Sequence, residues 1–133
     1  MNKEIWLFVC AHGRLGFELV NTAQMIVGEL ENVYAFSLES GMAPEEFGNQ
    51  IETKLKEAPG EVLCLVDLFG GTPCNQCVML SRYYNLHIIS GVNLPMLIEL
   101  YNNRNECEIA DLITRGLDVI TTSCKDVLFE INN

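Results

Sequence analysis

Short apolar runs alternate with longer helix-like segments along this chain, and this alternation constrains the fold more than any other feature. Runs rich in Val, Ile, Leu and Phe occur at 5–11, 33–38, 62–66 and 86–89. The segments between them place apolar residues three or four positions apart, which is typical of helices that bury one face. Strands that alternate with helices predict an α/β fold with a mostly parallel sheet and helices on both faces.

The helices can be placed by their apolar spacing and by their start signals. Pro44 and Pro73 fit the first turn of the second and third helices, with Thr72 as the expected N-cap of the third. The remaining expected helices cover 15–30, 95–101 and 109–117, and the segment 127–131 is interpreted as a short terminal strand. A chain of 133 residues fits one domain, and we expect residues 1–133 to form it.

Charge and composition exclude several classes of protein. The formal charge of −10, from 18 acidic and 8 basic residues, would repel nucleic acid. No apolar run is long enough to cross a bilayer and no leader segment is visible, so we expect a cytoplasmic location without membrane insertion. The 6 cysteines lie mostly among apolar residues, which indicates reduced thiols rather than a disulfide framework.

Two titratable residues lie at the ends of two expected strands. His12 ends the first and Asp67 follows the third. In a doubly wound sheet of order 2-1-3-4, the strand order reverses between strands one and three, and ligand sites lie beyond the carboxyl ends of the strands at that point. With this order, His12 and Asp67 would face each other across the crevice.

This pair suits phosphoryl transfer. A neutral imidazole is a nucleophile, and a carboxylate on its other ring nitrogen fixes the tautomer and stabilises the cation that forms. Gly70, Gly71 and Thr72 follow Asp67 and can aim backbone N–H groups and a hydroxyl at phosphoryl oxygens, beside the positive end of a helix. We therefore assign catalytic roles to His12 and Asp67 and phosphoryl binding to the other three, with no cofactor and no metal.

Three stretches around these residues resemble the signatures of mannose-family IIA domains of the bacterial sugar phosphotransferase system. They are Ala11-His12-Gly13-Arg14-Leu15, the nine residues from Asp67 to Asn75 (DLFGGTPCN), and the eight from Ser90 to Leu97 (SGVNLPML). The resemblance covers nearly the whole chain in matching order. The departures are modest: Cys10 stands where a small hydroxylic residue is common, Gly16 where alanine is usual, and Cys74 in the glycine-containing loop.

The resemblance implies a phosphotransferase role. His12 would accept a phosphoryl group from the phosphocarrier protein HPr and pass it to a IIB component for sugar uptake, and Asp67 would orient His12. It also implies a homodimer in which the terminal strand, 127–131, pairs antiparallel with the partner's sheet. Because no further domain follows Asn133, the IIB component is expected to be a separate polypeptide.

Other functions also fit the pattern. The phosphoryl group could pass to a dihydroxyacetone kinase, or the chain could be a regulatory module phosphorylated on His12. Asp67 could itself be a phosphoacceptor, as in receiver domains, but those have an acidic pair after the first strand where this chain has Ala11-His12. The transported sugar is open among mannose, fructose, sorbose and amino sugars, since a IIA domain meets only other proteins and a phosphoryl group.

Four remaining residues have more than one interpretation. Cys74 and Cys77 have the spacing of a redox or zinc motif, but zinc would need two further ligands, so we expect structural thiols. Arg14 is either a solvated helix-start residue or a docking residue for an acidic partner or phosphate. His87 is expected to pack or hydrogen-bond at a strand start, and it is given no functional role.

Overall fold

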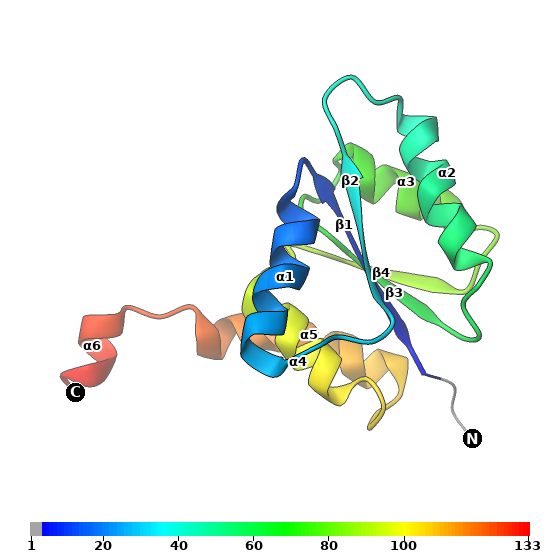
Figure 1. Cartoon of the computed structure of the whole chain (residues 1–133). Coiled ribbons are helices and arrows are strands. Elements are labelled where there is room, and N and C mark those ends of the chain that lie inside the picture. Colours follow the sequence, from blue (N-terminus) through cyan, green and yellow to red (C-terminus); the bar gives the residue numbers. More distant parts are fainter. Residues whose placement is uncertain (1–3) are drawn as a thin grey trace.

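A four-stranded sheet forms the centre of the molecule, with helices on both sides (Figure 1). The computed structural model describes residues 4–133. Strands and helices alternate as the apolar pattern predicts, up to the fourth helix. In chain order the elements are β1 (Trp6–His12), α1 (Leu15–Val27), β2 (Val33–Leu38), α2 (Pro44–Leu55), β3 (Val62–Val66), α3 (Thr72–Leu80), β4 (Leu86–Ser90), α4 (Leu94–Asn103), α5 (Ile109–Ser123) and α6 (Val127–Ile131).

The order of the strands is β2-β1-β3-β4, and every pair is parallel, which confirms the order predicted from the sequence. In the register of β1 and β3, Trp6 lies opposite Val62 and Cys10 opposite Val66. The two strands therefore end at the same edge of the sheet. His12 is the last residue of β1, and Asp67 directly follows β3.

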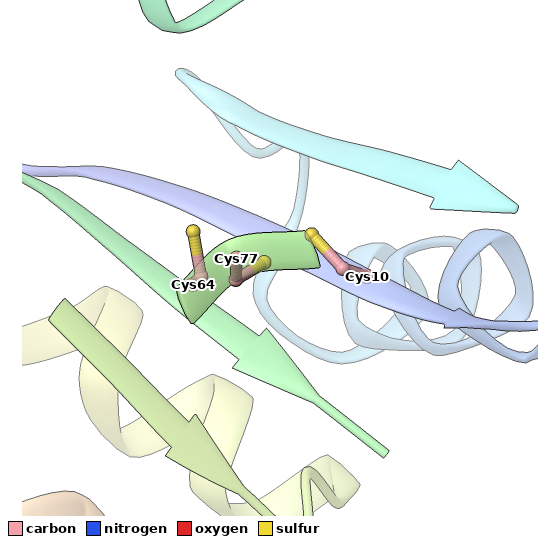
Figure 2. Close-up of side chains that lie close together, drawn as sticks. All are labelled: Cys10, Cys64 and Cys77. Carbon is pink, nitrogen blue, oxygen red and sulfur yellow. The ribbon is translucent and has the colours of Figure 1, made fainter. Parts of the chain in front are cut away.

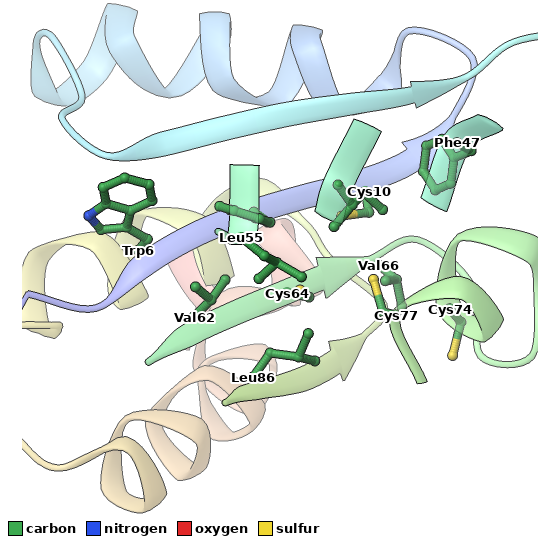
Figure 3. Close-up of a cluster of buried hydrophobic side chains, with 12 residues drawn as sticks. Trp6, Cys10, Phe47, Leu55, Val62, Cys64, Val66, Cys74, Cys77 and Leu86 are labelled. Carbon is green, nitrogen blue, oxygen red and sulfur yellow. The ribbon is translucent and has the colours of Figure 1, made fainter. Parts of the chain in front are cut away.

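Alternate residues of β1 and β3 contribute to two separate cores. Cys10 and Cys64 lie in the first core with residues of α2 and α3 (Figure 3), and Phe8 belongs to the same core, whereas Leu7 and Val9 face the opposite side. Both faces of the central strands are buried, because successive side chains point to opposite sides of a sheet. Helices α1, α4 and α5 cover the second core (Figure 1).

The terminal segment differs from the sequence prediction. Residues Val127–Ile131 form the helix α6 instead of an antiparallel strand, and the helix extends away from the sheet (Figure 1). The carboxylate of Asp126 accepts a hydrogen bond from the Phe129 N–H at 3.2 Å and so caps its first turn. A strand needs a neighbouring edge to satisfy its backbone, and this segment has none beside it in the single chain. No helix within residues 4–133 is long and apolar enough to cross a membrane.

Candidate functional site

His12 and Asp67 meet at the carboxyl edge of the sheet, as the sequence predicted. Nδ1 of the His12 ring lies 2.8 Å from Oδ2 of Asp67. The same oxygen accepts a hydrogen bond from the His12 backbone N–H at 2.9 Å. Asp67 Oδ1 accepts from the Leu68 N–H at 3.0 Å, so both carboxylate oxygens have partners. This network fixes the aspartate and, through it, the imidazole.

The hydrogen bonds at Asp67 determine its charge. Partial burial raises the pKa of this carboxyl group, but the hydrogen bonds from the His12 backbone N–H and the His12 ring, the charge interaction with His12 and a hydrogen bond with the backbone of Asp67 itself outweigh that effect and lower it. Asp67 is therefore ionised at neutral pH. An ionised carboxylate has no proton to give, so Nδ1 of His12 is the donor in this pair.

The orientation of the imidazole leaves its other nitrogen free to react. With the Nδ1 proton directed at Asp67, Nε2 carries the lone pair. The His12 side chain is 46% exposed whereas that of Asp67 is 10% exposed. The ring is therefore accessible to solvent, and the carboxylate that binds it is largely buried. The arrangement can present a neutral imidazole as a nucleophile and stabilise the imidazolium that forms on attack.

The glycine turn after Asp67 lies against this ring. A Cβ atom placed on Gly71 would be 3.2 Å from Cε1 of His12, a distance that only a glycine avoids here. Gly70 has φ +81°, a left-handed conformation that favours glycine. The turn therefore needs glycine at position 71 because of the nearby ring, and at position 70 because of the backbone conformation.

Helix α3 begins at this turn, one residue earlier than expected. Gly71 is the N-cap, and Thr72 is the first helical residue rather than the cap. Within residues 4–133, the backbone amides of Gly70 and Thr72 have no hydrogen-bond acceptor in the chain. They lie at the start of a helix, where the dipole favours anions. The turn that approaches the His12 ring at Gly71 thus carries two available N–H groups.

A groove of about 440 Å³ opens beside His12. Its lining includes Gly13, Ser40, Met42 and Thr72. Phe69, in the turn that follows Asp67, is 90% exposed. A larger cavity of about 640 Å³ lies at the opposite edge of the sheet, next to residues that precede β1 and β3, so it is separate from this histidine.

Arg14 and His87 lie outside the His12–Asp67 pair. Arg14 is the N-cap residue of α1, with an exposed side chain 4.0 Å from Glu18 and 5.6 Å from the Phe17 ring centroid. His87 has Glu61 as a partner, with Nε2 and Oε1 3.4 Å apart, which the sequence did not indicate. Glu61 directly precedes β3, so the pair lies away from the edge that carries His12.

A cluster of cysteines lies in the core beneath the site. Cys77 of α3 faces Cys10 of β1 and Cys64 of β3 (Figure 2). The thiols of Cys10 and Cys64 act as donors to Cys77 and lower its pKa to about 5, whereas burial raises the pKa of Cys10. Sequence spacing had paired Cys77 with Cys74. Of the other cysteines, Cys74 is buried, Cys107 is half-buried and Cys124 is exposed.

The fold and the site together define an α/β domain that presents an accessible histidine, held by a carboxylate, where the strand order reverses. Residues 7–115 match the family described as the PTS system fructose IIA component. The chain therefore belongs to the mannose family of EIIA components of the sugar phosphotransferase system, which are phosphotransferase-type proteins.

Curated relatives agree with this assignment. The fructose-specific EIIA component of Bacillus subtilis is 32% identical over 82% of this chain and 77% of its own length. The sorbose-specific EIIA component of Klebsiella pneumoniae is 32% identical over 86% of this chain and 85% of its own. The mannose-specific EIIAB component of Escherichia coli is 36% identical over 77% of this chain but only 32% of its own length.

Solved structures show the same fold. The EIIA component from Streptococcus agalactiae has a TM-score of 0.86 at 26% identity and covers 94% of this chain and 98% of its own. The mannose/sorbose-specific IIA subunit from Enterococcus faecalis has a TM-score of 0.73 at 33% identity, with 87% and 92% covered.

Proposed function

We propose that this protein accepts a phosphoryl group from phosphorylated HPr on Nε2 of His12 and passes it to a IIB component during sugar uptake. The observation that carries the proposal is the His12–Asp67 pair, in which the Nδ1 to Oδ2 distance of 2.8 Å leaves Nε2 as the open nucleophile. Membership of the EIIA family supports the role of phosphocarrier. A cytoplasmic location, where the donor protein would reach it, is part of the proposal.

The chemistry follows from the groups around the ring. Nε2 attacks phosphorus, the bond from phosphorus to the donor breaks, and the ring becomes cationic as the new N–P bond forms. The negative charge of Asp67 stabilises that cation, and the proton stays on Nδ1. Transfer of the phosphoryl group from His12 to the IIB component reverses these steps and needs the same groups and no cofactor.

The turn after Asp67 supplies the binding groups in this proposal. The N–H groups of Gly70 and Thr72 and the Thr72 hydroxyl would donate to phosphoryl oxygens, and Gly71 lets the turn approach the ring. Arg14, at the start of α1, would contribute to docking because its guanidinium is exposed and the groove beside His12 includes neighbouring Gly13. The fructose, mannose and sorbose specificities of the relatives differ, so no particular sugar is proposed.

The test is phosphorylation of the purified protein with phosphoenolpyruvate, enzyme I and HPr. Intact mass measured without acid should show a gain of one phosphoryl group, and tandem mass mapping should place it on His12. His12→Ala should gain none, whereas the matched control His87→Ala, which changes the other histidine, should be phosphorylated normally. Phosphorylation of His12→Ala at the wild-type rate would refute the assignment.

Onward transfer is measured separately. Phosphorylated wild-type protein should lose its phosphoryl group within seconds to minutes after mixing with a cognate IIB component and should retain it with buffer alone. Transfer to a dihydroxyacetone kinase instead would redirect the proposal to that acceptor. A stable phosphoprotein that passes the group to neither would indicate a regulatory module.

We also propose that the protein is a homodimer. Four apolar side chains of α6 are exposed in the single chain, namely Val127, Leu128, Phe129 and Ile131. A helix of five residues with no buried residue has little stability by itself, so burial of this face against a second copy accounts for its apolar composition.

A further inference from the structure

Three thiols from three different elements converge in the first core. Cys10 comes from β1, Cys64 from β3 and Cys77 from α3, and their Sγ atoms all lie within 4.8 Å of one another. All three residues are fully buried. Figure 2 shows Cys77 between the other two, with the helix crossing above the paired strands.

The backbone geometry argues against a disulfide between the two strand cysteines. Cys10 lies opposite Val66 and Cys64 opposite Phe8, so the two cysteines are diagonal neighbours, two residues out of register. With strands about 4.8 Å apart and about 3.3 Å per residue, their Cα atoms are about 8 Å apart. A disulfide requires less than about 7 Å. A central atom bound by all three sulfurs needs no such approach of the backbones.

The surroundings determine which atom could be bound. The cluster lies among apolar side chains, with Phe47 and Val66 in the same core (Figure 3). Among residues 4–133, no other cysteine, histidine or carboxylate joins the group, so zinc would lack its fourth ligand. Thiolates select soft ions, and a net charge in an apolar core is costly. A trivalent ion with three thiolates is neutral.

We propose that Cys10, Cys64 and Cys77 form a binding site for a three-coordinate trivalent metalloid, of which arsenic(III) is the simplest probe. The hydroxide As(OH)₃ exchanges its three hydroxyl groups for three sulfur ligands: three As–O bonds break, three As–S bonds form, and each hydroxyl leaves as water. The proton for each water comes from a thiol, or from solvent where the thiol of Cys77 is already ionised. No electron is transferred and no base is consumed. The product is uncharged, which suits its apolar surroundings.

Entry to the site requires α3 to open. This helix has 9 residues, and it covers the cluster from one side. Short helices open locally at a lower free energy than the strands of a central sheet. We therefore expect binding to be slow compared with the reaction of the exposed thiol of Cys124 and to slow hydrogen exchange in α3 once complete.

The experiment is native mass spectrometry of the reduced, folded chain with sodium arsenite, followed by X-ray absorption at the arsenic edge. We expect one arsenic per chain, a mass gain of one arsenic less three hydrogens, and three sulfur neighbours. Cys77→Ala should weaken binding by at least the roughly 10- to 100-fold that loss of even an outer-shell partner costs a metal site. Circular dichroism checks that the variant is folded.

The control keeps the cluster and removes every other thiol. The combined variant Cys74→Ala, Cys107→Ser and Cys124→Ser should bind arsenic as the wild type does, with three sulfur neighbours. The wild type and this control decide the question even where Cys77→Ala fails to fold. Absence of binding to the reduced wild type in excess arsenite, fewer than three sulfur neighbours, or unchanged binding in folded Cys77→Ala would overturn the proposal.

Discussion

A single oxygen of Asp67, Oδ2, accepts hydrogen bonds from both the backbone N–H and the ring Nδ1 of His12. The carboxylate therefore positions the end of β1 and the imidazole at the same time. Strand and side chain cannot shift relative to each other without breaking one of these bonds. The orientation of Nε2 is thus linked to the register of β1 and β3, and not only to the rotamer of His12.

Asp67→Asn should slow phosphoryl acceptance by His12. An amide oxygen can still accept from Nδ1, but it lacks the charge that stabilises the developing imidazolium. We expect a loss of roughly 10²- to 10⁴-fold in rate, the usual range for general acid–base groups. The measurement is rapid-quench phosphorylation from phosphorylated HPr. An unchanged rate would remove Asp67 from the mechanism.

The same variant should alter the pH dependence of stability. The folded-state pKa of Asp67 lies below its unfolded value of about 3.9, so the pair stabilises the fold above that pH and the contribution is lost as pH falls through the folded pKa. The difference in free energy of unfolding between wild type and Asp67→Asn should be largest near pH 7 and should shrink in acid. Urea denaturation at pH 7 and pH 3 measures it. An equal difference at both values would contradict the assigned shift.

Gly71→Ala should separate activity from stability. The backbone of Gly71 has φ −76°, which alanine adopts readily, so the free energy of unfolding should stay equal or rise by up to about 1 kcal/mol. The new Cβ would lie 3.2 Å from His12 Cε1 and displace the ring by a few tenths of an ångström. Phosphorylation should be slower although the protein is fully folded. A wild-type rate would show that the ring has room to adjust.

Gly116→Ala tests the contact between α4 and α5. A Cβ there would lie 2.9 Å from Leu100 Cδ2 and 3.3 Å from Ile89 Cδ1, in the second core. Overpacking of this kind costs typically 1–3 kcal/mol, which should exceed the gain of about 1 kcal/mol in helix propensity. Chemical denaturation gives the result. Thr114→Ala, on the exposed side of α5, is the control and should not destabilise the protein.

Deletion of residues 126–133 tests the role proposed for α6. If its apolar face is buried against a second copy, light scattering should give the full-length chain the molar mass of a dimer and the truncated chain that of a monomer. Asp126→Ala, which removes only the N-cap, should weaken association by the equivalent of about 1 kcal/mol. A full-length chain that is monomeric at high concentration would refute the dimer.

Much of this architecture could be predicted from the sequence, because the local signals agree with the global fold. The strands near Leu7 and Val62 are continuous apolar runs, as expected for strands buried on both faces. The strand ends then placed His12 beside Asp67. The helix α6 could not be predicted in this way, because the periodicity of a mostly apolar segment of five residues does not distinguish a strand from a helix.

The cysteine cluster needed the structure for a different reason. Local spacing joins Cys77 to Cys74, but the side chain of Cys77 meets residues that are distant in sequence. The parity of Cys10 in β1 and Cys64 in β3 places both on the same face of the sheet, which is a usable signal only once the strand register is known. The position of α3 above that face follows from packing and not from any motif.

Only one nitrogen of His12 is open, and it opens at one edge of the sheet. A donor and an acceptor that both need this atom cannot occupy the protein together. In the proposed role the donor and the acceptor must bind one after the other, so each competitively inhibits binding of the other. The overall rate of phosphoryl transfer then depends on how quickly each partner dissociates after it has reacted. An affinity that is too high for either partner would slow that dissociation and therefore the transfer.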